Sequence, residues 1–204
     1  MTTVTEAIDI GGARLLLERP VDPESLIDEQ AFAEDEFLPY WAERWPSGIA
    51  LAEYAALLDL RGTRILELGC GLGVPSLVAA RRGAEVVATD WSPDAVGLLA
   101  RNAARNRVRL DAVTADWRDG GALAARGPFG LVLAADVLYE ERNAAPILAL
   151  LAALEAPAAI ADPGRRHAMQ FLELARADGW EIDTVADERI PQGGIHRLSR
   201  VRPS

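Results

Sequence analysis

The chain has 204 residues, half of them hydrophobic and a quarter charged, which is the composition of a folded globular protein and not of a disordered or fibrous one. Its formal net charge of −10 argues against broad nucleic-acid binding, which depends on basic patches; it is compatible with a cationic substrate, although a solvated acidic surface is the commoner cause. The sequence shows no membrane-spanning apolar run, no signal peptide and a single cysteine, so we expect a cytoplasmic protein without disulfides.

The N-terminal part of the chain is predicted to hold a hairpin, a helix and an irregular aromatic segment before its second helix. Two apolar runs flank a Gly-Gly pair, which is typical of a β-hairpin. An Asp-Pro pair then indicates a helix start, with the aspartate as N-cap and the proline in the first turn. The predicted elements are the hairpin over residues 7–17, the helix from Asp22 toward Phe32, the irregular segment over 37–48 and the helix over 49–58.

From residue 64 onward, short apolar runs alternate with segments of helical spacing. The predicted strands cover 64–68, 85–89, 110–114, 129–135, 158–161, 180–185 and 196–201, and the predicted helices cover 74–82, 92–106, 141–154 and 166–177. Strands that alternate with helices indicate a parallel sheet with helices on both faces, and we expect the last two strands to pair antiparallel. The predicted fold is therefore α/β, a Rossmann-like, doubly wound, seven-stranded sheet that is mostly parallel, with an antiparallel last strand.

The most informative segment joins the first strand of this sheet to the following helix. It carries an acid and three glycines at alternate positions, Glu67, Gly69, Gly71 and Gly73. Such a loop lets the backbone approach a nucleoside, and Asp90, which lies 21 residues after Gly69, has the spacing of an acid that binds ribose hydroxyls. The alternative is that the glycines only permit a tight turn between strand and helix.

The spacing of the glycines indicates which nucleoside is bound. A dinucleotide fingerprint would place its third glycine at position 74, where the chain has Val74, one residue after Gly73. Glu67 is unfavourable beside a pyrophosphate, whereas it suits a ligand that carries an ammonium group. S-adenosylmethionine (AdoMet) carries an ammonium and a sulfonium group and no phosphate. Together with Asp90 and a third acid, Asp116, the pattern predicts AdoMet as the cofactor.

Other common motifs of catalytic and metal sites are missing. The sequence contains no lysine, which excludes a Walker phosphate-binding loop, and it contains no G-x-S-x-G nucleophile elbow. His167 and His196 do not have the spacing of metal ligands, and we interpret them as ordinary surface or strand residues. No metal site is predicted.

On four of its motifs, the chain resembles the class I, seven-strand AdoMet-dependent methyltransferases. More narrowly, it is similar to the lysine methyltransferase family that includes the electron transfer flavoprotein beta-subunit lysine methyltransferase, whose bacterial members are often labelled predicted nicotinamide N-methylases. The motifs are the aromatic segment 39–48, the glycine segment 67–73, Ala135-Asp136-Val137-Leu138-Tyr139 and Ala161-Asp162-Pro163-Gly164-Arg165. The glycine segment is common to all class I enzymes, and the other three are more specific.

The likeness extends from about Ile8 to Arg202 and implies a single methyltransferase domain. Residues 1–45 would form an N-terminal extension with the hairpin and helix, and residues 46–204 would form the class I core. The chain departs from the family in lacking an insert large enough to recognise a protein substrate by itself. The choice of substrate is therefore left open by the resemblance.

The resemblance also implies donor-binding and catalytic residues at the matching positions. Trp45 would contact AdoMet from the N-terminal side, Asp90 would bind the ribose, and Asp116 would accept a hydrogen bond from the adenine amine. Asp136 and Tyr139 would be catalytic and face the nucleophile. The full donor-binding set is Trp45, Glu67, Gly69, Cys70, Gly71, Asp90, Trp91, Asp116, Trp117 and Ala135.

Some of these assignments have alternatives. Trp45 could stack on the donor or cover its sulfonium, but it could also pack over the sheet edge. Tyr139 could pack against the next helix instead of facing the substrate. Asp136 could orient an acceptor amine or take its proton, and both roles stay open at this point.

The function predicted from these features is AdoMet-dependent N-methylation, with a protein lysine as acceptor. We expect a monomer that acts on a protein presenting a lysine, or on a small amine, and binds neither nucleic acid nor membranes. One alternative is methylation of a small, nicotinamide-like amine. The other is a non-catalytic module that binds AdoMet or its demethylated product, against which an intact Asp136-x-x-Tyr139 motif argues.

Overall fold

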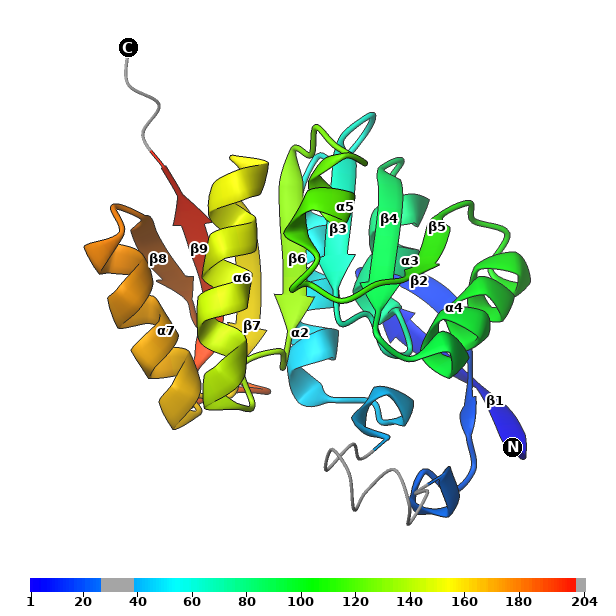
Figure 1. Cartoon of the computed structure of the whole chain (residues 1–204). Helices are drawn as coiled ribbons and strands as arrows, with labels where there is room; N and C mark the ends of the chain where they lie inside the picture. The colour runs from blue at the N-terminus through cyan, green and yellow to red at the C-terminus, as the bar shows by residue number, and fades with distance from the viewer. Residues whose placement is uncertain (27–38, 201–204) are drawn as a thin grey trace.

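The computed structural model describes residues 1–26 and 39–200, and Figure 1 shows a central sheet with helices on both faces and a separate hairpin. In chain order, the first elements are β1 Thr3–Ile10, β2 Ala13–Pro20, the 3₁₀ helices η1 Glu24–Leu26 and η2 Tyr40–Ala42, α2 Pro46–Leu57, β3 Arg64–Leu68, α3 Val74–Arg81, β4 Glu85–Asp90 and α4 Pro93–Arg105. They are followed by β5 Asp111–Thr114, α5 Gly120–Ala124, β6 Leu131–Ala135, α6 Glu141–Leu154, β7 Ala158–Asp162, α7 Arg166–Ala177, β8 Glu181–Val185 and β9 Gly194–Ser199.

The seven strands of the sheet have the order β5-β4-β3-β6-β7-β9-β8. All neighbours are parallel except β9, which is antiparallel to both β7 and β8. The predicted fold class, including the antiparallel last strand, is confirmed. The winding direction reverses between β3 and β6, and ligands of doubly wound sheets bind beside such a reversal, at the carboxyl ends of the strands.

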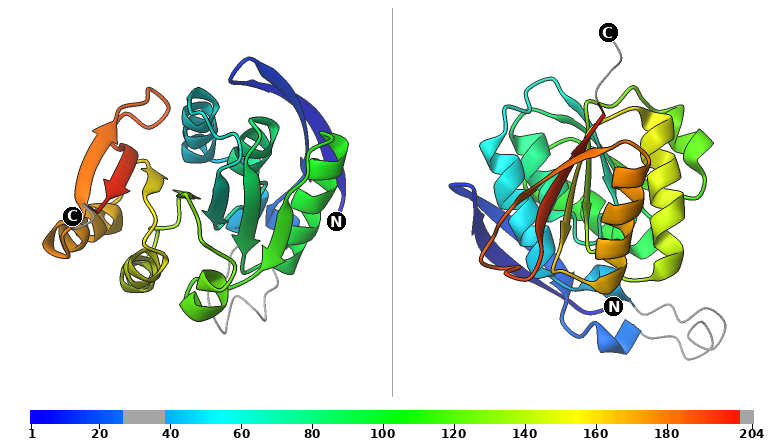
Figure 2. Two further views of the ribbon diagram at one scale, coloured as in Figure 1. Left: turned by 90° about the horizontal axis from the view of Figure 1, so that it is seen from above. Right: turned by 90° about the vertical axis from the view of Figure 1, so that its left-hand side faces the viewer.

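The core divides into two apolar clusters, one on each face of the sheet. Successive residues of a strand point to opposite faces, so that Ile65 contributes to one cluster and Leu66 to the other. The hairpin, α2, α3 and α4 cover the face of Ile65, whereas α5, α6 and α7 cover the face of Leu66. Viewed from above, the hairpin lies beside α4, far from β8 and β9 at the other end of the sheet (Figure 2).

Asn102 of α4 and Asn106, which caps the carboxyl end of that helix, attach the hairpin to the core, because they bond the free edge of β2 as a third strand would. The side chain of Asn102 accepts from the N–H of Glu18 (2.7 Å) and donates to its carbonyl (3.0 Å). Asn106 makes the same pair of bonds to Leu16, at 2.8 and 2.7 Å. Since an uncovered strand edge exposes unpaired backbone groups, these amides close the edge of the hairpin.

Most predicted elements agree with the structure, and the differences are local. The helix predicted from Asp22 is a short 3₁₀ helix, Glu24–Leu26, as far as residue 26, and its continuation toward Phe32 lies outside the described residues. Helix α2 begins at Pro46 and not at residue 49, because a proline is well accommodated in the first turn. The short helix α5 was not predicted; Asp119 caps it, accepting from Ala122 N at 3.4 Å.

Candidate functional site

The glycine loop lies at the carboxyl edge of the sheet, where β3 passes into α3. Gly69, Gly71 and Gly73 all have positive φ angles, of 62°, 50° and 74°. At Gly73 a side chain is also excluded by packing, because an added Cβ would lie 2.2 Å from Cδ1 of Leu99. The turn therefore requires glycine at this position, as the alternative interpretation of the motif supposes, but the loop also lines a cavity.

Asp90 holds this loop from the neighbouring strand. It is the last residue of β4, and its buried carboxylate accepts from the backbone N–H of Gly71 (2.9 Å) and of Ser92 (3.0 Å). Burial raises the pKa of Asp90, and these backbone N–H groups partly oppose the rise. Each oxygen of a carboxylate can accept a second hydrogen bond, so Asp90 retains acceptor positions for the hydroxyls of a ligand.

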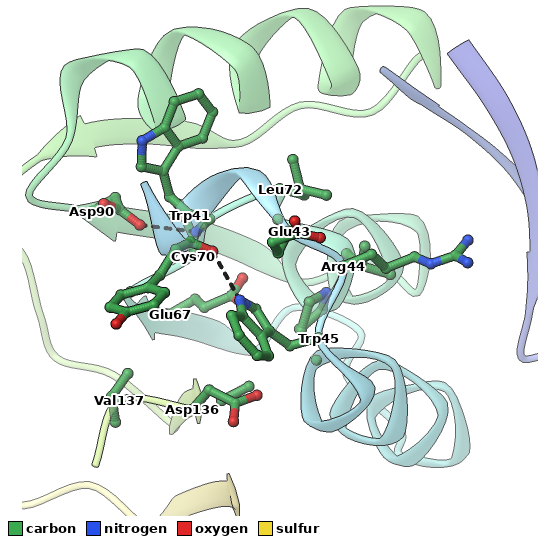
Figure 3. A pocket seen from close by; sticks show the side chains of 18 of the residues that line it. Trp41, Glu43, Arg44, Trp45, Glu67, Cys70, Leu72, Asp90, Asp136 and Val137 are labelled. Atoms are coloured by element: carbon green, nitrogen blue, oxygen red, sulfur yellow. Dashed lines mark hydrogen bonds between the residues drawn. The ribbon is translucent and has the colours of Figure 1, made fainter. Parts of the chain in front are cut away.

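Glu67 is buried in the floor of the same cavity. The hydroxyl of Ser76, in the first turn of α3, donates to its Oε2. Burial raises the pKa of Glu67 to about 8, because the charged form loses its hydration. A cationic group placed beside it would restore the ionised form. In the view of Figure 3, Glu67 lies between Asp90 and Asp136.

Aromatic side chains cover one side of the cavity. The ring centroids of Tyr40 and Trp45 are 6.1 Å apart, and those of Tyr40 and Tyr139 are 5.5 Å apart. The indole N–H of Trp45 donates to the backbone carbonyl of Tyr40 at 2.8 Å, a bond drawn in Figure 3. Tyr40 was not predicted as a site residue, and for Trp41 the sequence left a site role and packing over the sheet edge equally open; both line the cavity, and both lie in the aromatic segment that carries the family likeness. The contact of Tyr40 with Tyr139 forms only because the aromatic segment packs against the segment that follows β6, and the local sequence does not indicate that packing.

A third acidic residue, Asp136, lines the same cavity as Glu67 and Asp90. Asp136 follows β6, has a positive φ of 59°, and forms an ion pair through Oδ1 with Arg165. Its other oxygen, Oδ2, is buried without a hydrogen-bond partner among the residues that the structure describes. The buried hydroxyl of Ser47 likewise has no partner, yet it is close enough to favour the ionised form of Asp136. Burial is the larger effect, so the pKa of Asp136 is raised.

Arg165 and Asp162 were quoted as part of the Asp-Pro-Gly-Arg motif but were not predicted to have roles. Asp162 is the last residue of β7, next to β6 in the sheet, and it is fully buried. Its Oδ2 lies 3.1 Å from the same guanidinium nitrogen of Arg165 that contacts Asp136. The Asp-Pro-Gly-Arg motif draws attention to Asp162 and Arg165 in the sequence. Only the adjacency of β6 and β7 in the sheet shows that Arg165 also reaches Asp136.

The cavity brings together nearly all of the residues predicted from the sequence. Its lining includes both predicted catalytic residues and every predicted donor-binding residue except Asp116. Asp116 lines an adjoining cavity of about 680 Å³, which shares Trp91, Trp117 and Tyr139 with the first. The first cavity has a volume of only about 100 Å³, below the ~300–1,000 Å³ typical of ligand sites. A nucleoside would therefore occupy both.

Asp116 is already paired within the protein. Its Oδ1 accepts from the backbone N–H of Arg118 and its Oδ2 from the guanidinium Nε, both at 2.8 Å. Arg118 accordingly lowers the pKa of Asp116. Binding of an adenine amine by Asp116 stays a prediction, and it would require sharing this carboxylate with Arg118.

No group of three or more histidine, cysteine, aspartate or glutamate side chains within residues 1–26 and 39–200 is placed to hold a metal ion. The two histidines lie on different elements: His167, on α7, contacts Gln170, whereas His196, on β9, contacts Thr184 of β8. Over the same described ranges, no helix is both long and apolar enough to cross a membrane.

Comparisons with known proteins identify a family and several relatives. A family model described as "Lysine methyltransferase" matches residues 38–168. The protein N-lysine methyltransferase METTL21A of Danio rerio is 33% identical over 116 residues, covering 52% of this chain and 52% of that protein. The electron transfer flavoprotein beta subunit lysine methyltransferase of Xenopus laevis is 34% identical over 108 residues, covering 50% of this chain and 42% of that protein.

A third relative has another acceptor in its name. The histone-arginine methyltransferase METTL23 of Homo sapiens is 33% identical over 113 residues, which cover 52% of this chain and 60% of that protein. The chain thus spans about half the length of the curated relatives that it matches.

Solved structures of other methyltransferases share the fold. The T. thermophilus 16S rRNA methyltransferase RsmC, in complex with AdoMet and guanosine, superposes with a TM-score of 0.66 at 19% identity, covering 98% of this chain and 51% of that one. The magnesium protoporphyrin IX methyltransferase ChlM from Synechocystis, with bound SAH, has a TM-score of 0.62 at 16% identity, covering 87% of this chain and 100% of that one. The resemblance stated from the motifs is confirmed, and because the family model spans more than half of the chain, the chain belongs to the lysine methyltransferase family.

Proposed function

We propose that this protein transfers a methyl group from AdoMet to the side-chain amine of a lysine in another protein. The observation that carries the proposal is the placement of three acids around one cavity: the buried Glu67 and Asp90 beside the glycine loop, and the largely buried Asp136 with one unpartnered oxygen. The first two suit a nucleoside that carries an ammonium group. The third suits an amine that approaches from the opposite side. Family membership supports the same reading.

The residues of the two cavities fit AdoMet group by group. Glu67 would bind the ammonium of the methionine part, and its raised pKa would fall when it does so. Asp90 would accept from the ribose hydroxyls, and Trp91 and Trp117, which line both cavities, would flank the adenine. Stacking of a base on an aromatic ring contributes about 1–3 kcal/mol.

The chain's own contribution to the reaction is alignment and exclusion of water. AdoMet supplies a methyl group that is already activated on a sulfonium. A lysine amine has an ordinary pKa of about 10.4, which desolvation lowers, so a cavity walled by Tyr40, Trp45 and Tyr139 favours the neutral, nucleophilic form. Asp136 would accept one N–H of this amine and hold its lone pair toward the methyl group.

The proposal is tested by incubating the purified protein with cell extract and AdoMet that carries a tritium-labelled methyl group. We expect label in a protein band on a denaturing gel, and methyl-lysine in the hydrolysate of that band. Methyl-arginine there would assign a different acceptor. Label found only in the small-molecule fraction would favour a small amine, and binding of AdoMet with no transfer at all would favour a non-catalytic module.

The matched control for this experiment is Asp136→Asn. The amide has the shape of the carboxylate but no charge, so the variant should still bind AdoMet, as measured by calorimetry, and should keep only a small, measurable part of the labelling rate. Transfer at the wild-type rate would contradict the role given to Asp136.

A further inference from the structure

Arg165 joins two buried acids that end neighbouring strands. One nitrogen of its guanidinium contacts Oδ1 of Asp136, after β6, and lies 3.1 Å from Oδ2 of Asp162, at the end of β7. The Asp136 side chain is only 10% exposed and that of Asp162 1%, so water solvates neither charge well. A buried carboxylate without a partner is strongly destabilising, which makes Arg165 the compensating charge for both.

The position of Arg165 is itself determined by Asp162. Oδ1 of Asp162 accepts from the backbone N–H groups of Gly164 (2.8 Å) and Arg165 (2.7 Å), which fixes the turn between β7 and α7. Gly164 has a φ of +96°, and an added Cβ would lie 2.4 Å from the backbone oxygen of Gln192. The turn is thus held from two sides, and Arg165 starts from a rigid backbone.

The two oxygens of Asp136 are therefore not equivalent. Oδ1 is occupied by Arg165, whereas Oδ2 is buried with no hydrogen bond among the described residues; the neighbouring Ser47 hydroxyl is likewise unbonded but close enough to favour the ionised form of Asp136. Asp136 lines the same cavity as Trp45, Tyr139 and Asp90. An unpaired buried acceptor of this kind is satisfied when a ligand supplies an N–H.

We propose that Arg165 is a positioning residue for methyl transfer: it holds Asp136 so that Oδ2 accepts one N–H of the acceptor amine and leaves the lone pair directed at the methyl group. The inference rests on the proposed function and deepens it. Because Oδ1 is held by the guanidinium, only Oδ2 can meet the amine, and in this arrangement Asp136 orients the amine by accepting one N–H and takes no proton. Of the two roles that the sequence left open for Asp136, the proposal assigns the orienting one.

Methyl transfer to the neutral amine needs no base within the site. The neutral amine forms the new N–C bond while the S–C bond breaks, and the electron pair of that bond goes to sulfur. The product nitrogen becomes a methylated ammonium, which still donates to Asp136 and loses its proton to solvent afterwards.

The test compares Arg165→Gln and Arg165→Lys with Arg166→Gln, which makes the same change one residue further on, at an exposed position. The rate of label transfer into extract protein is measured at saturating extract, together with the KM and Kd of AdoMet. We expect Arg165→Gln to lower the maximal rate by about 100-fold and to leave the Kd of AdoMet within about threefold of wild type. Arg165→Lys should recover part of the rate, and Arg166→Gln should match wild type.

A double variant distinguishes positioning from a separate role. If Arg165 acts through Asp136, then Arg165→Gln should cost little further rate in the Asp136→Asn background. Losses that multiply in the double variant, or a Kd of AdoMet that rises together with the loss of rate, would overturn the proposal. Should Arg165→Gln fail to fold, Arg165→Lys takes its place, and a wild-type rate for that variant would be contradictory. Absence of transfer by the wild-type protein would instead contradict the proposed function.

Discussion

At the scale of single residues, the site is built from buried acids that end parallel strands. Glu67, Asp90, Asp136 and Asp162 lie at or beside the carboxyl ends of β3, β4, β6 and β7. The compensation of these charges differs: backbone N–H groups bond Asp90, Arg165 pairs with both Asp136 and Asp162, and the uncharged Ser76 bonds Glu67. Glu67 is therefore the acid whose charge state depends most on what is bound beside it.

Donor binding should depend on pH through Glu67. Its pKa of about 8 in the folded protein lies above the ordinary value of 4.5, so the ligand-free protein holds a proton there at pH 6. Binding an ammonium requires the carboxylate, so the affinity for AdoMet should rise from pH 6 to 8, by at most about tenfold per unit. Calorimetry should show this slope for wild type and a flat profile for Glu67→Gln. A flat wild-type profile would contradict the assignment.

The raised pKa of Glu67 also affects the stability of the ligand-free protein, which should fall as pH rises, whereas the affinity for AdoMet should rise. Because the folded protein binds the Glu67 proton more tightly than the unfolded chain does, this residue's contribution to the free energy of unfolding falls as pH rises from about 4.5 to 8 and is constant above. Thermal unfolding of ligand-free Glu67→Gln, compared with wild type, should therefore show a stabilising effect that grows over this window.

Asp90 has a structural and a binding role that can be separated. Asp90→Asn keeps the size of the side chain but removes a charged acceptor, so the affinity for AdoMet should fall by about 10- to 100-fold. Asp94→Asn, at an exposed position of the following helix, is the matched control and should bind normally. Equal affinities for the two variants in calorimetry would remove Asp90 from the ribose site.

At the scale of elements, the hairpin depends on helix α4 as well as on its own turn. Asn102 and Asn106 bond the edge of β2, and Glu18 of β2 pairs with Arg101 and Arg105 of α4 at 3.2 and 2.7 Å. Asn102 and Asn106 lie about one helical turn apart, and this spacing matches that of Glu18 and Leu16, which are two residues apart on β2. The hairpin is thus attached by a register of specific bonds in addition to apolar contacts.

This register predicts unequal costs for two similar substitutions. Asn102→Ala leaves the buried N–H and C=O of Glu18 unpaired and should lower the free energy of unfolding by about 2–4 kcal/mol. Asn106→Ala should cost less, about 1 kcal/mol, because Leu16 is exposed and water can replace the amide. Urea denaturation measures both, and equal losses would contradict the argument from burial.

At the scale of the whole molecule, the protein carries a net charge of −10, and its site is proposed to accept an amine. A lysine-bearing protein should be attracted by this field, and salt screens such attraction over about 8–10 Å. At limiting acceptor, raising sodium chloride from about 50 to about 500 mM should therefore slow transfer several-fold. The Kd of AdoMet, measured in the same buffers, separates this effect from donor binding. A salt-independent rate would indicate an uncharged acceptor.

The sequence alone predicted those parts of the fold that depend on local pattern. The ranges of α6 and α7 agree with the prediction, because their apolar residues recur with helical spacing over 12 residues or more. The glycine unit from β3 to β4 is also correct, since glycines and strand ends are local signals. Helix α5 was missed because five residues are too few to show a period.

The sequence by itself determined the fold class, the family and most of the residues around the cavity, because the acids and glycines of the site directly follow apolar strands and can be recognised from the local order of residues. What only the tertiary structure decided was which of these residues meet. The contact of Arg165 with Asp136 depends on β6 and β7 lying side by side, and that of Tyr40 with Tyr139 on the return of η2 over the sheet edge. Such contacts join residues 29 and 99 positions apart, a separation over which no local pattern is informative.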